Sequence, residues 1–138
     1  MRMPSLEEMC LITTELHDRS LEPNHLTGLT SGTSLIGALA RPYNQMTYGL
    51  VGDIFDVAAS FCEALARGHV FRDGNKRTAF AVMTYILDVN DVRFRFPAGR
   101  TEDMMVSVAE GTASADQLAW FLRGLTVEAS YNLREIDR

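Results

Sequence analysis

The stretch DIFDVAASFCEALARGHVFRDGNKRTAFAVMTYILDVN, residues 53–90, decides how this chain folds. Before Gly68, apolar side chains recur at the three- and four-residue spacing of a helix face. After the loop, residues 79–90 are apolar on most sides, as in a central buried helix. The stretch therefore predicts two packed helices joined by the loop GHVFRDGNKRT, residues 68–78. The apolar face of the helix before the loop consists of Val51, Ile54, Phe55, Ala58, Phe61, Cys62 and Leu65.

Toward the N-terminus the pattern stays helical. Ser5 followed by Glu8 is a capping-box signature that predicts the start of a first helix. A polar loop is expected from about residue 20 to residue 33. Residues 34–40 predict a short helix that ends at Arg41, because the residue before Pro42 avoids helical dihedral angles. The face of the first helix consists of Leu6, Met9, Cys10, Thr13 and Leu16.

Toward the C-terminus, VRFRF at 92–96 alternates and predicts a short strand or one arm of a β-hairpin near residues 92–100. Thr101 is a candidate cap for a helix that ends at Gly111, and Ser114 with Gln117 forms another capping box before the last helix. The tail from about residue 129 is polar and expected to be loose. No repeat or linker divides the chain, so the predicted fold is a single all-α domain over residues 1–138.

Charge is unevenly distributed along the chain. The whole sequence carries −5, whereas residues 67–77 carry +3 and the remainder −8. An acidic body lacks the broad basic face of a nucleic-acid binder, so no direct nucleic-acid partner is expected. One cationic loop on such a body instead indicates a small anion such as a nucleotide. Lys76, in this loop, is the only lysine beside twelve arginines.

No basic segment followed by an apolar run opens the sequence, and no stretch reaches membrane-spanning length. We therefore expect a cytoplasmic protein with no membrane partner. Cys10 and Cys62 both fall in helical patterns and are expected to be buried free thiols.

The loop places phosphate-binding groups at the start of a helix. Gly74 and Asn75 precede the second helix, and the first N–H groups of a helix lack partners within it. Such an end, with its positive dipole and the side chains of Lys76 and Arg77, is suited to bind phosphate. A solvated helix start is the plainer alternative. A Walker-type phosphate loop is excluded, because it would need glycine at Val70 and at Asn75.

Two side chains of the loop add chemistry to this phosphate site. His69 stands four residues before Asp73 and is a candidate general base. Asp73 is a candidate ligand for a Mg²⁺ ion that bridges phosphates, although it could instead cap the following helix. Phe71 is expected to be a buried anchor of the loop. Arg67 could bind phosphate or form a salt bridge. His17 and His25 are expected to be structural or surface residues.

Taken in order, His69-x-Phe71-x-Asp73-Gly74-Asn75-Lys76-Arg77-Thr78 resembles the signature of the Fic/Doc superfamily, in its Doc branch. Other segments are similar to that branch in the same order and spacing, so the resemblance covers about residues 5–125. These segments are ELHD at 15–18, SLIGALARP at 34–42, YG at 48–49 and DIFDVAASFCEALARGH at 53–69.

The resemblance implies a compact helical fold and transfer of phosphate from ATP, with Mg²⁺, to a serine or threonine hydroxyl of a protein target. By resemblance, that target is translation elongation factor Tu, the result is inhibition of translation, and a Phd-type antitoxin neutralises the toxin. AMP-transferring members carry glycine at the position of Lys76 and arginine at that of Phe80, which favours phosphate transfer here. Transfer of AMP and a catalytically inactive binding module remain the alternatives.

An antitoxin of this kind would need an apolar groove. Leu11 and Ile12 lie off the face that packs the first helix, so at least one of them is expected to be exposed in such a groove. A first helix that is packed on two sides is the alternative.

Overall fold

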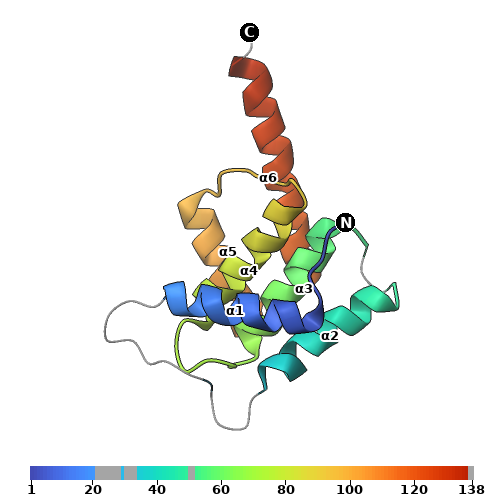
Figure 1. The fold of residues 1–138 in the computed structure, drawn as a ribbon. Coiled ribbons are helices and arrows are strands. Elements are labelled where there is room, and N and C mark those ends of the chain that lie inside the picture. The colour runs from blue at the N-terminus through green and yellow to red at the C-terminus, as the bar shows by residue number, and fades with distance from the viewer. Residues whose placement is uncertain (21–28, 30–33, 50–51, 137–138) are drawn as a thin grey trace.

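The computed structural model describes residues 1–20, 29, 34–49 and 52–136, and within them the chain forms six helices and no strand (Figure 1). An isolated antiparallel bridge joins Leu29 to Phe71. The predicted all-α fold is thus confirmed, whereas most of the predicted loop at 20–33, His25 included, lies outside the described residues. The helices are α1 (Leu6–Ser20), α2 (Leu35–Thr47), α3 (Ile54–Arg67), α4 (Asn75–Val89), α5 (Ala98–Glu110) and α6 (Ala115–Ile136).

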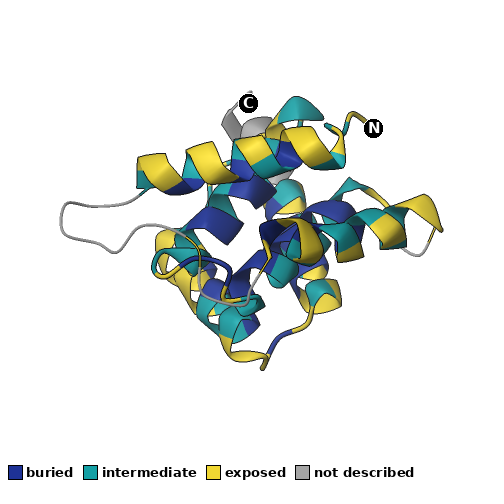
Figure 2. Ribbon diagram, turned by 60° about the horizontal axis from the view of Figure 1, so that its bottom comes forward, coloured by how far each residue is buried: buried dark blue, intermediate teal, exposed yellow. Residues whose placement is uncertain are grey.

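The α3–α4 pair forms the centre of the molecule, as the sequence predicts. Helix α3 packs against α2, α4, α5 and α6, and α4 packs on its other side against α1. Buried residues lie on the sides of the helices that face one another (Figure 2), and they form one continuous core. Because α3 and α4 are central, the loop between them is held at both ends by buried helices.

Both predicted capping boxes are present. The N–H of Glu8 donates to Ser5 Oγ at 3.1 Å, and the N–H of Ser5 donates to Glu8 Oε1 at 3.2 Å. At the start of α6, Ser114 and Gln117 exchange the same two bonds at 2.8 and 3.2 Å. These caps fix where α1 and α6 begin.

Helix α2 corrects the predicted stop before Pro42. The helix starts after Ser34, whose Oγ accepts the N–H of Gly37, but it continues through Pro42 to Thr47. Pro42 is buried, and the ring of Tyr43 packs edge-on against Phe61 of α3 at 5.1 Å. Packing against α3 thus outweighs the local preference for a break at proline.

The segment before α5 corrects two further predictions. Residues 92–97 form no strand or hairpin, and 98–100 are already the first turn of α5. Alternation at 92–96 arises because Phe94 and Phe96 pack on the core while Arg93 and Arg95 face solvent. The N-cap of α5 is Pro97 rather than Thr101, which lies within the helix.

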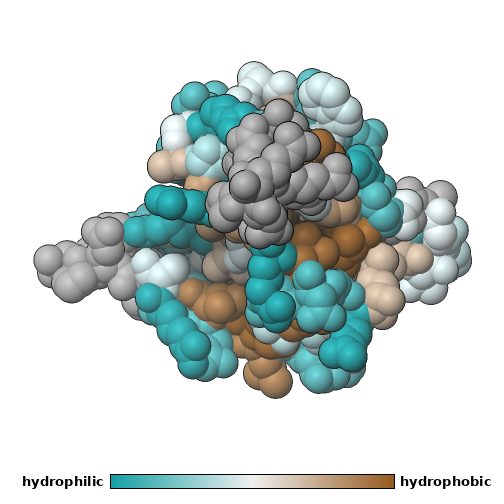
Figure 3. All heavy atoms as spheres, turned by 90° about the horizontal axis from the view of Figure 1, so that it is seen from above, coloured by the Kyte–Doolittle hydropathy of each residue, from teal (hydrophilic) through white to brown (hydrophobic). Residues whose placement is uncertain are grey.

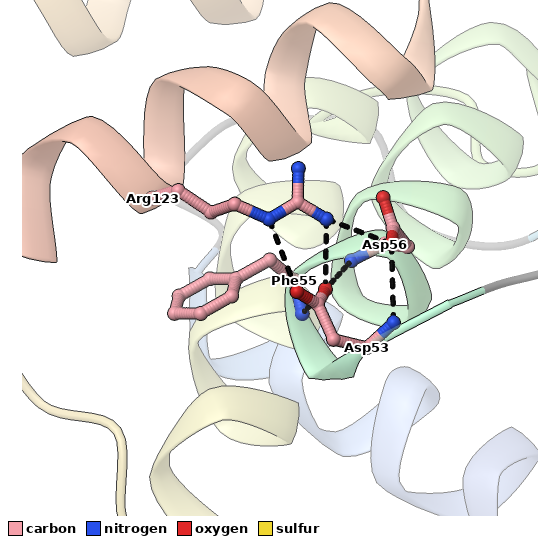
Figure 4. Close-up of polar contacts among 4 residues, drawn as sticks. All are labelled: Asp53, Phe55, Asp56 and Arg123. Atoms are coloured by element: carbon pink, nitrogen blue, oxygen red, sulfur yellow. Dashed lines mark hydrogen bonds and ion pairs between the residues drawn. The ribbon is translucent and has the colours of Figure 1, made fainter.

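Helix α6 extends well beyond the other helices (Figure 1). It continues through residue 129 to Ile136, so the segment expected to be a loose tail is helical over that length. Near its first turns, Arg123 of α6 reaches the N-terminus of α3, donating two bonds to the Asp53 carboxylate and one to Asp56 at 2.7–3.0 Å (Figure 4). This network joins α6 to α3.

Three further findings concern the surface, the two cysteines and the length of the apolar helices. On the face seen from above, hydrophobic areas lie near the middle and hydrophilic ones around the rim (Figure 3). Cys10 and Cys62 are free thiols as expected, but only Cys62 is buried, whereas Cys10 is partly exposed. Burial raises the pKa of Cys62 to about 12. Among the described residues, no helix is long and apolar enough to cross a membrane.

Candidate active site

A cleft of about 850 Å³ opens between the α3–α4 loop and α5. One wall is the loop and the first turn of α4, and the other is formed by α5 and the residue just before its cap. A volume of this size is typical of pockets for small molecules and cofactors. The predicted residues that line the cleft are His69, Asp73, Gly74, Asn75, Lys76 and Arg77.

The start of α4 faces this cleft without a side-chain cap. The N-cap is Gly74, whose φ of 75° is in the left-handed region that glycine tolerates best. Its carbonyl accepts the N–H of Thr78 at 2.9 Å, which closes the first turn. Because glycine offers no side-chain oxygen to the N–H groups ahead of that bond, a ligand can take the place of a cap.

Asn75 fixes the shape of the loop through two hydrogen bonds. Its Oδ1 accepts the N–H of Phe71 at 3.0 Å, and its Nδ2 donates to the carbonyl of Phe71 at 2.8 Å. Both polar ends of this side chain are thereby engaged with the backbone of the loop. Any phosphate contact from Asn75 is then expected through its backbone N–H, and its side chain acts on the loop.

His17 of α1 supports the loop from beneath. It is buried, and its ring stacks on Phe71 with centroids 3.8 Å apart and planes 9° from parallel. Its Nε2 donates to the carbonyl of Asp73 at 2.8 Å, so this nitrogen carries a proton. Phe71 itself is only 4% exposed. The sequence predicts His17 to be a structural or surface residue, and the structure shows the structural role. Its contact with the loop depends on the packing of α1 against α4, which no local sequence pattern indicates.

His69 and Asp73 are the two residues of the loop with candidate roles in the chemistry. His69 is exposed in the cleft, and its φ of 48° is in the left-handed region that few non-glycine residues adopt. The Asp73 Oδ1 accepts the N–H of Gly74 at 2.8 Å. This bond orients the carboxylate beside the start of α4, where phosphate is expected.

Lys76 and Arg77 place positive charge on the same wall. Lys76 is 48% exposed, and its Nζ lies 3.8 Å from Glu102 Oε1 on α5, across the cleft. Arg72, from the same loop, also lines the cleft. Three cations thus surround the uncapped helix start.

Arg67 corrects the predicted phosphate contact. It is not among the described residues that line the cleft. Its Nε donates to the carbonyl of Val108 at 2.8 Å, a second nitrogen donates to the carbonyl of Ala113, and a third lies 3.4 Å from Glu63. Arg67 therefore satisfies carbonyl groups at the end of α5, which is the salt-bridge alternative with two backbone bonds added.

Sequence reasoning missed the wall that faces the loop. Its residues come from α3, α4, α5 and the segment just before α5, and no motif joins them, because only the fold brings these segments together. They are Ala66, Phe80, Phe96, Ala98, Thr101, Glu102, Met105 and Ala109.

Known proteins are similar to this chain over a stretch that includes the α3–α4 loop. A model of the Fic/DOC family matches residues 5–87. The protein named "Protein kinase doc" of Escherichia phage P1 is 32% identical over 111 residues, which is 80% of this chain and 87% of that protein. The protein named "Toxin Doc" of Mycolicibacterium smegmatis is 37% identical over 99 residues, which is 69% of this chain and 75% of that protein.

Proposed function

Because the chain belongs to the Fic/DOC family, we propose that it is a Doc-like toxin that transfers the γ-phosphate of ATP to a serine or threonine hydroxyl of a protein target. The observation that carries this proposal is the cleft in which His69 and Asp73 flank the uncapped start of α4. Two relatives named as a kinase and as a toxin support the same reading.

The proposed reaction divides its roles among these residues. His69 accepts the proton of the target hydroxyl as its oxygen attacks the γ-phosphorus, and the bond to the bridging oxygen of ADP breaks. The helix start, Lys76 and Arg77 stabilise the negative charge that develops on the phosphate oxygens. Transfer is complete when the phosphate ester has formed and ADP leaves.

A magnesium ion fits this site through Asp73. The described residues contain no cluster of three or more metal-ligating side chains. Magnesium at phosphate-transfer sites, however, is usually held by one or two carboxylates together with substrate phosphates. A single oriented carboxylate at the helix start meets that need, and the ion would neutralise charge on the phosphates.

Phe80 and Lys76 both line the cleft. By resemblance, AMP-transferring members have arginine at the position of Phe80 and glycine at the position of Lys76. This cleft therefore lacks that arginine and has a lysine that those members lack. This difference favours transfer of the γ-phosphate over transfer of AMP.

Labelled ATP tests the proposal directly. The protein is incubated with Mg²⁺, elongation factor Tu and ATP labelled at either the α- or the γ-phosphorus. We expect label on the target only from γ-labelled ATP, and on a threonine or serine. Label from the α-position would show AMP transfer instead, and no label from either would leave the inactive binding module. Testing elongation factor Tu beside a whole cytoplasmic extract separates the chemistry from the choice of target.

We further propose that a Phd-type antitoxin binds beside α1. An apolar groove of about 510 Å³ there is lined by Cys10, Leu11, Leu29, Leu35 and Ile36 with two polar residues at its edge. Leu11 is 73% exposed, whereas Ile12 packs on the core. The expectation that one of the two is exposed is thus met by Leu11.

The charged variant Leu11→Asp should weaken binding of the antitoxin and leave phosphate transfer unchanged, because no residue that lines the groove also lines the cleft. Val127→Asp, at an equally exposed apolar position on α6, is the matched control and should bind the antitoxin normally. Normal binding by Leu11→Asp would place the antitoxin elsewhere.

A further inference from the structure

The two walls of the cleft differ in chemistry. The loop wall carries cations, whereas the facing wall is largely apolar, with Phe80 and Phe96 packed edge-to-face at 5.0 Å and Met105 beside them. Aromatic and methionine side chains of this kind bind planar apolar groups well. A nucleotide with its phosphates at the start of α4 has one planar group to place, which is its base.

One polar side chain on the apolar wall has no partner. Thr101 is 8% exposed, and within the described part of the chain its hydroxyl makes no hydrogen bond. The buried hydroxyl of Thr78 in α4 also has no partner but does not line the cleft, whereas the hydroxyls of Thr13, Thr14 and Thr126 each donate to the carbonyl four residues earlier at 2.7–3.1 Å. A buried hydroxyl without a partner is destabilising, so its presence at a ligand cleft calls for a ligand.

We infer that Thr101 determines which nucleotide the cleft accepts, by a hydrogen bond from its hydroxyl to the polar edge of the purine base. This inference rests on the proposed ATP-dependent function. The hydroxyl both donates and accepts, so it can pair with a ring nitrogen or with an exocyclic amine. Threonine in a helix occupies two χ1 rotamers, and a change between them turns the hydroxyl of a cleft-lining residue toward a bound ligand.

The surroundings of Thr101 favour the base over the phosphates as its partner. Glu102 is the next residue of α5 and also lines the cleft, and its carboxylate repels phosphate. Phosphates are drawn to the other wall, where Arg72, Lys76 and Arg77 lie. The apolar neighbours of Thr101 exclude water, which makes one hydrogen bond there more selective than at an exposed site.

The test compares wild type with Thr101→Val, which keeps the shape of the side chain and removes the hydroxyl. Dissociation constants are measured by calorimetry for MgATP and for magnesium tripolyphosphate, which has no base. We expect Thr101→Val to weaken MgATP binding about two- to tenfold, the range of one hydrogen bond. Binding of tripolyphosphate should not change, and the melting temperature should equal or exceed that of wild type. Thr101→Ser, which keeps the hydroxyl, should restore MgATP binding.

Thr126→Val is the matched control, because it removes a hydroxyl that is already bonded within α6, away from the cleft. It should lower the melting temperature and leave MgATP binding unchanged. An unchanged affinity for MgATP in Thr101→Val, or an equal loss for MgATP and tripolyphosphate, would overturn the inference. The inference would also be overturned if Thr101→Val changed only the Michaelis constant for the protein target, because that result would show that this wall contacts the target. If wild type binds neither MgATP nor tripolyphosphate, the proposed function fails as well.

Discussion

The two central helices begin in opposite ways. At the start of α3, the Asp53 carboxylate accepts the N–H groups of Phe55 and Asp56, the Asp56 carboxylate accepts the N–H of Asp53, and Arg123 binds both carboxylates (Figure 4). At the start of α4, Gly74 provides no side-chain cap, and the side chains nearby are three cations, Arg72, Lys76 and Arg77, together with the Asp73 carboxylate.

The two helix starts differ in how the charges around them interact with the helix dipole. Negative side chains at the start of α3 satisfy the N–H groups and stabilise the fold. At the start of α4, positive side chains oppose the dipole, which is unfavourable until an anion binds. On the proposed function the first helix start is structural and the second binds the nucleotide, so substitutions at the two should separate stability from activity.

The largest effect is expected at the functional start. His69→Ala should lower phosphate transfer about 10²–10⁴-fold, the usual result of losing a general base. Its melting temperature should stay within a few degrees of wild type, because His69 is exposed on the loop. Initial rates with γ-labelled ATP measure the first quantity and differential scanning fluorimetry the second. His69→Asn, which tolerates the left-handed backbone, guards against a misfolded loop. Wild-type rates in either folded variant would contradict the role of His69.

A smaller effect, on stability alone, is expected at the structural start. Asp53→Ala removes the cap of α3 and one of the two carboxylate partners of Arg123, leaving Asp56, and should lower the free energy of unfolding by about 0.5–2 kcal/mol. Transfer by the folded variant should be unchanged. Asp53→Asn is the matched control: asparagine caps as well as aspartate, so it should lose less. Urea unfolding measures both. Equal losses would show that the ion pair with Arg123 matters and the cap does not.

Lys76 offers a test that needs no substitution. It is the only lysine, so amine-reactive reagents modify it and the α-amine alone. MgATP should slow modification of Lys76, because its half-exposed amine would contact phosphate, and leave the α-amine unaffected as an internal reference. Mass spectrometry of the two peptides gives both rates. Equal rates with and without MgATP would mean that Lys76 faces only Glu102 and solvent.

The smallest effect concerns pH at the start of α3. Hydrogen bonds from Arg123 hold the pKa of Asp53 below its ordinary value of 3.8. Its contribution to stability is therefore complete above that value and is lost as the pH falls through the lowered pKa. Because the pair is half exposed, this contribution is at most about 1 kcal/mol. The stability difference between wild type and Asp53→Asn should shrink between pH 6 and strongly acidic pH. A constant difference would show that the charge of Asp53 is not its source.

The sequence predicted what depends on local pattern and missed what depends on contacts across the fold. Capping boxes at Ser5 and Ser114 and the α3–loop–α4 unit follow from spacing within a few residues. Pro42 was misread because burial against α3, which no local pattern reveals, outweighs its preference. Arg67 was left open because its partners, the carbonyls of Val108 and Ala113, lie some forty residues away in sequence.

The candidate site divides in the same way. The loop wall was predicted residue by residue, because a contiguous motif brings histidine, aspartate and cations together. The wall with Thr101 and Phe96 was not, because it joins the loop only through the packing of α5 on α3 and α4.

The bonds from Asn75 and the stacking of His17 have a consequence for the speed of binding. They hold the loop in one shape before any ligand arrives, so its conformational entropy is lost in folding and not in binding. On the proposed function we therefore expect a nucleotide to bind in one step, at a rate set by diffusion and by attraction to the cations of the loop, without a slow rearrangement. Differences in affinity between nucleotides therefore arise from how long each complex lasts, since all of them form at similar rates.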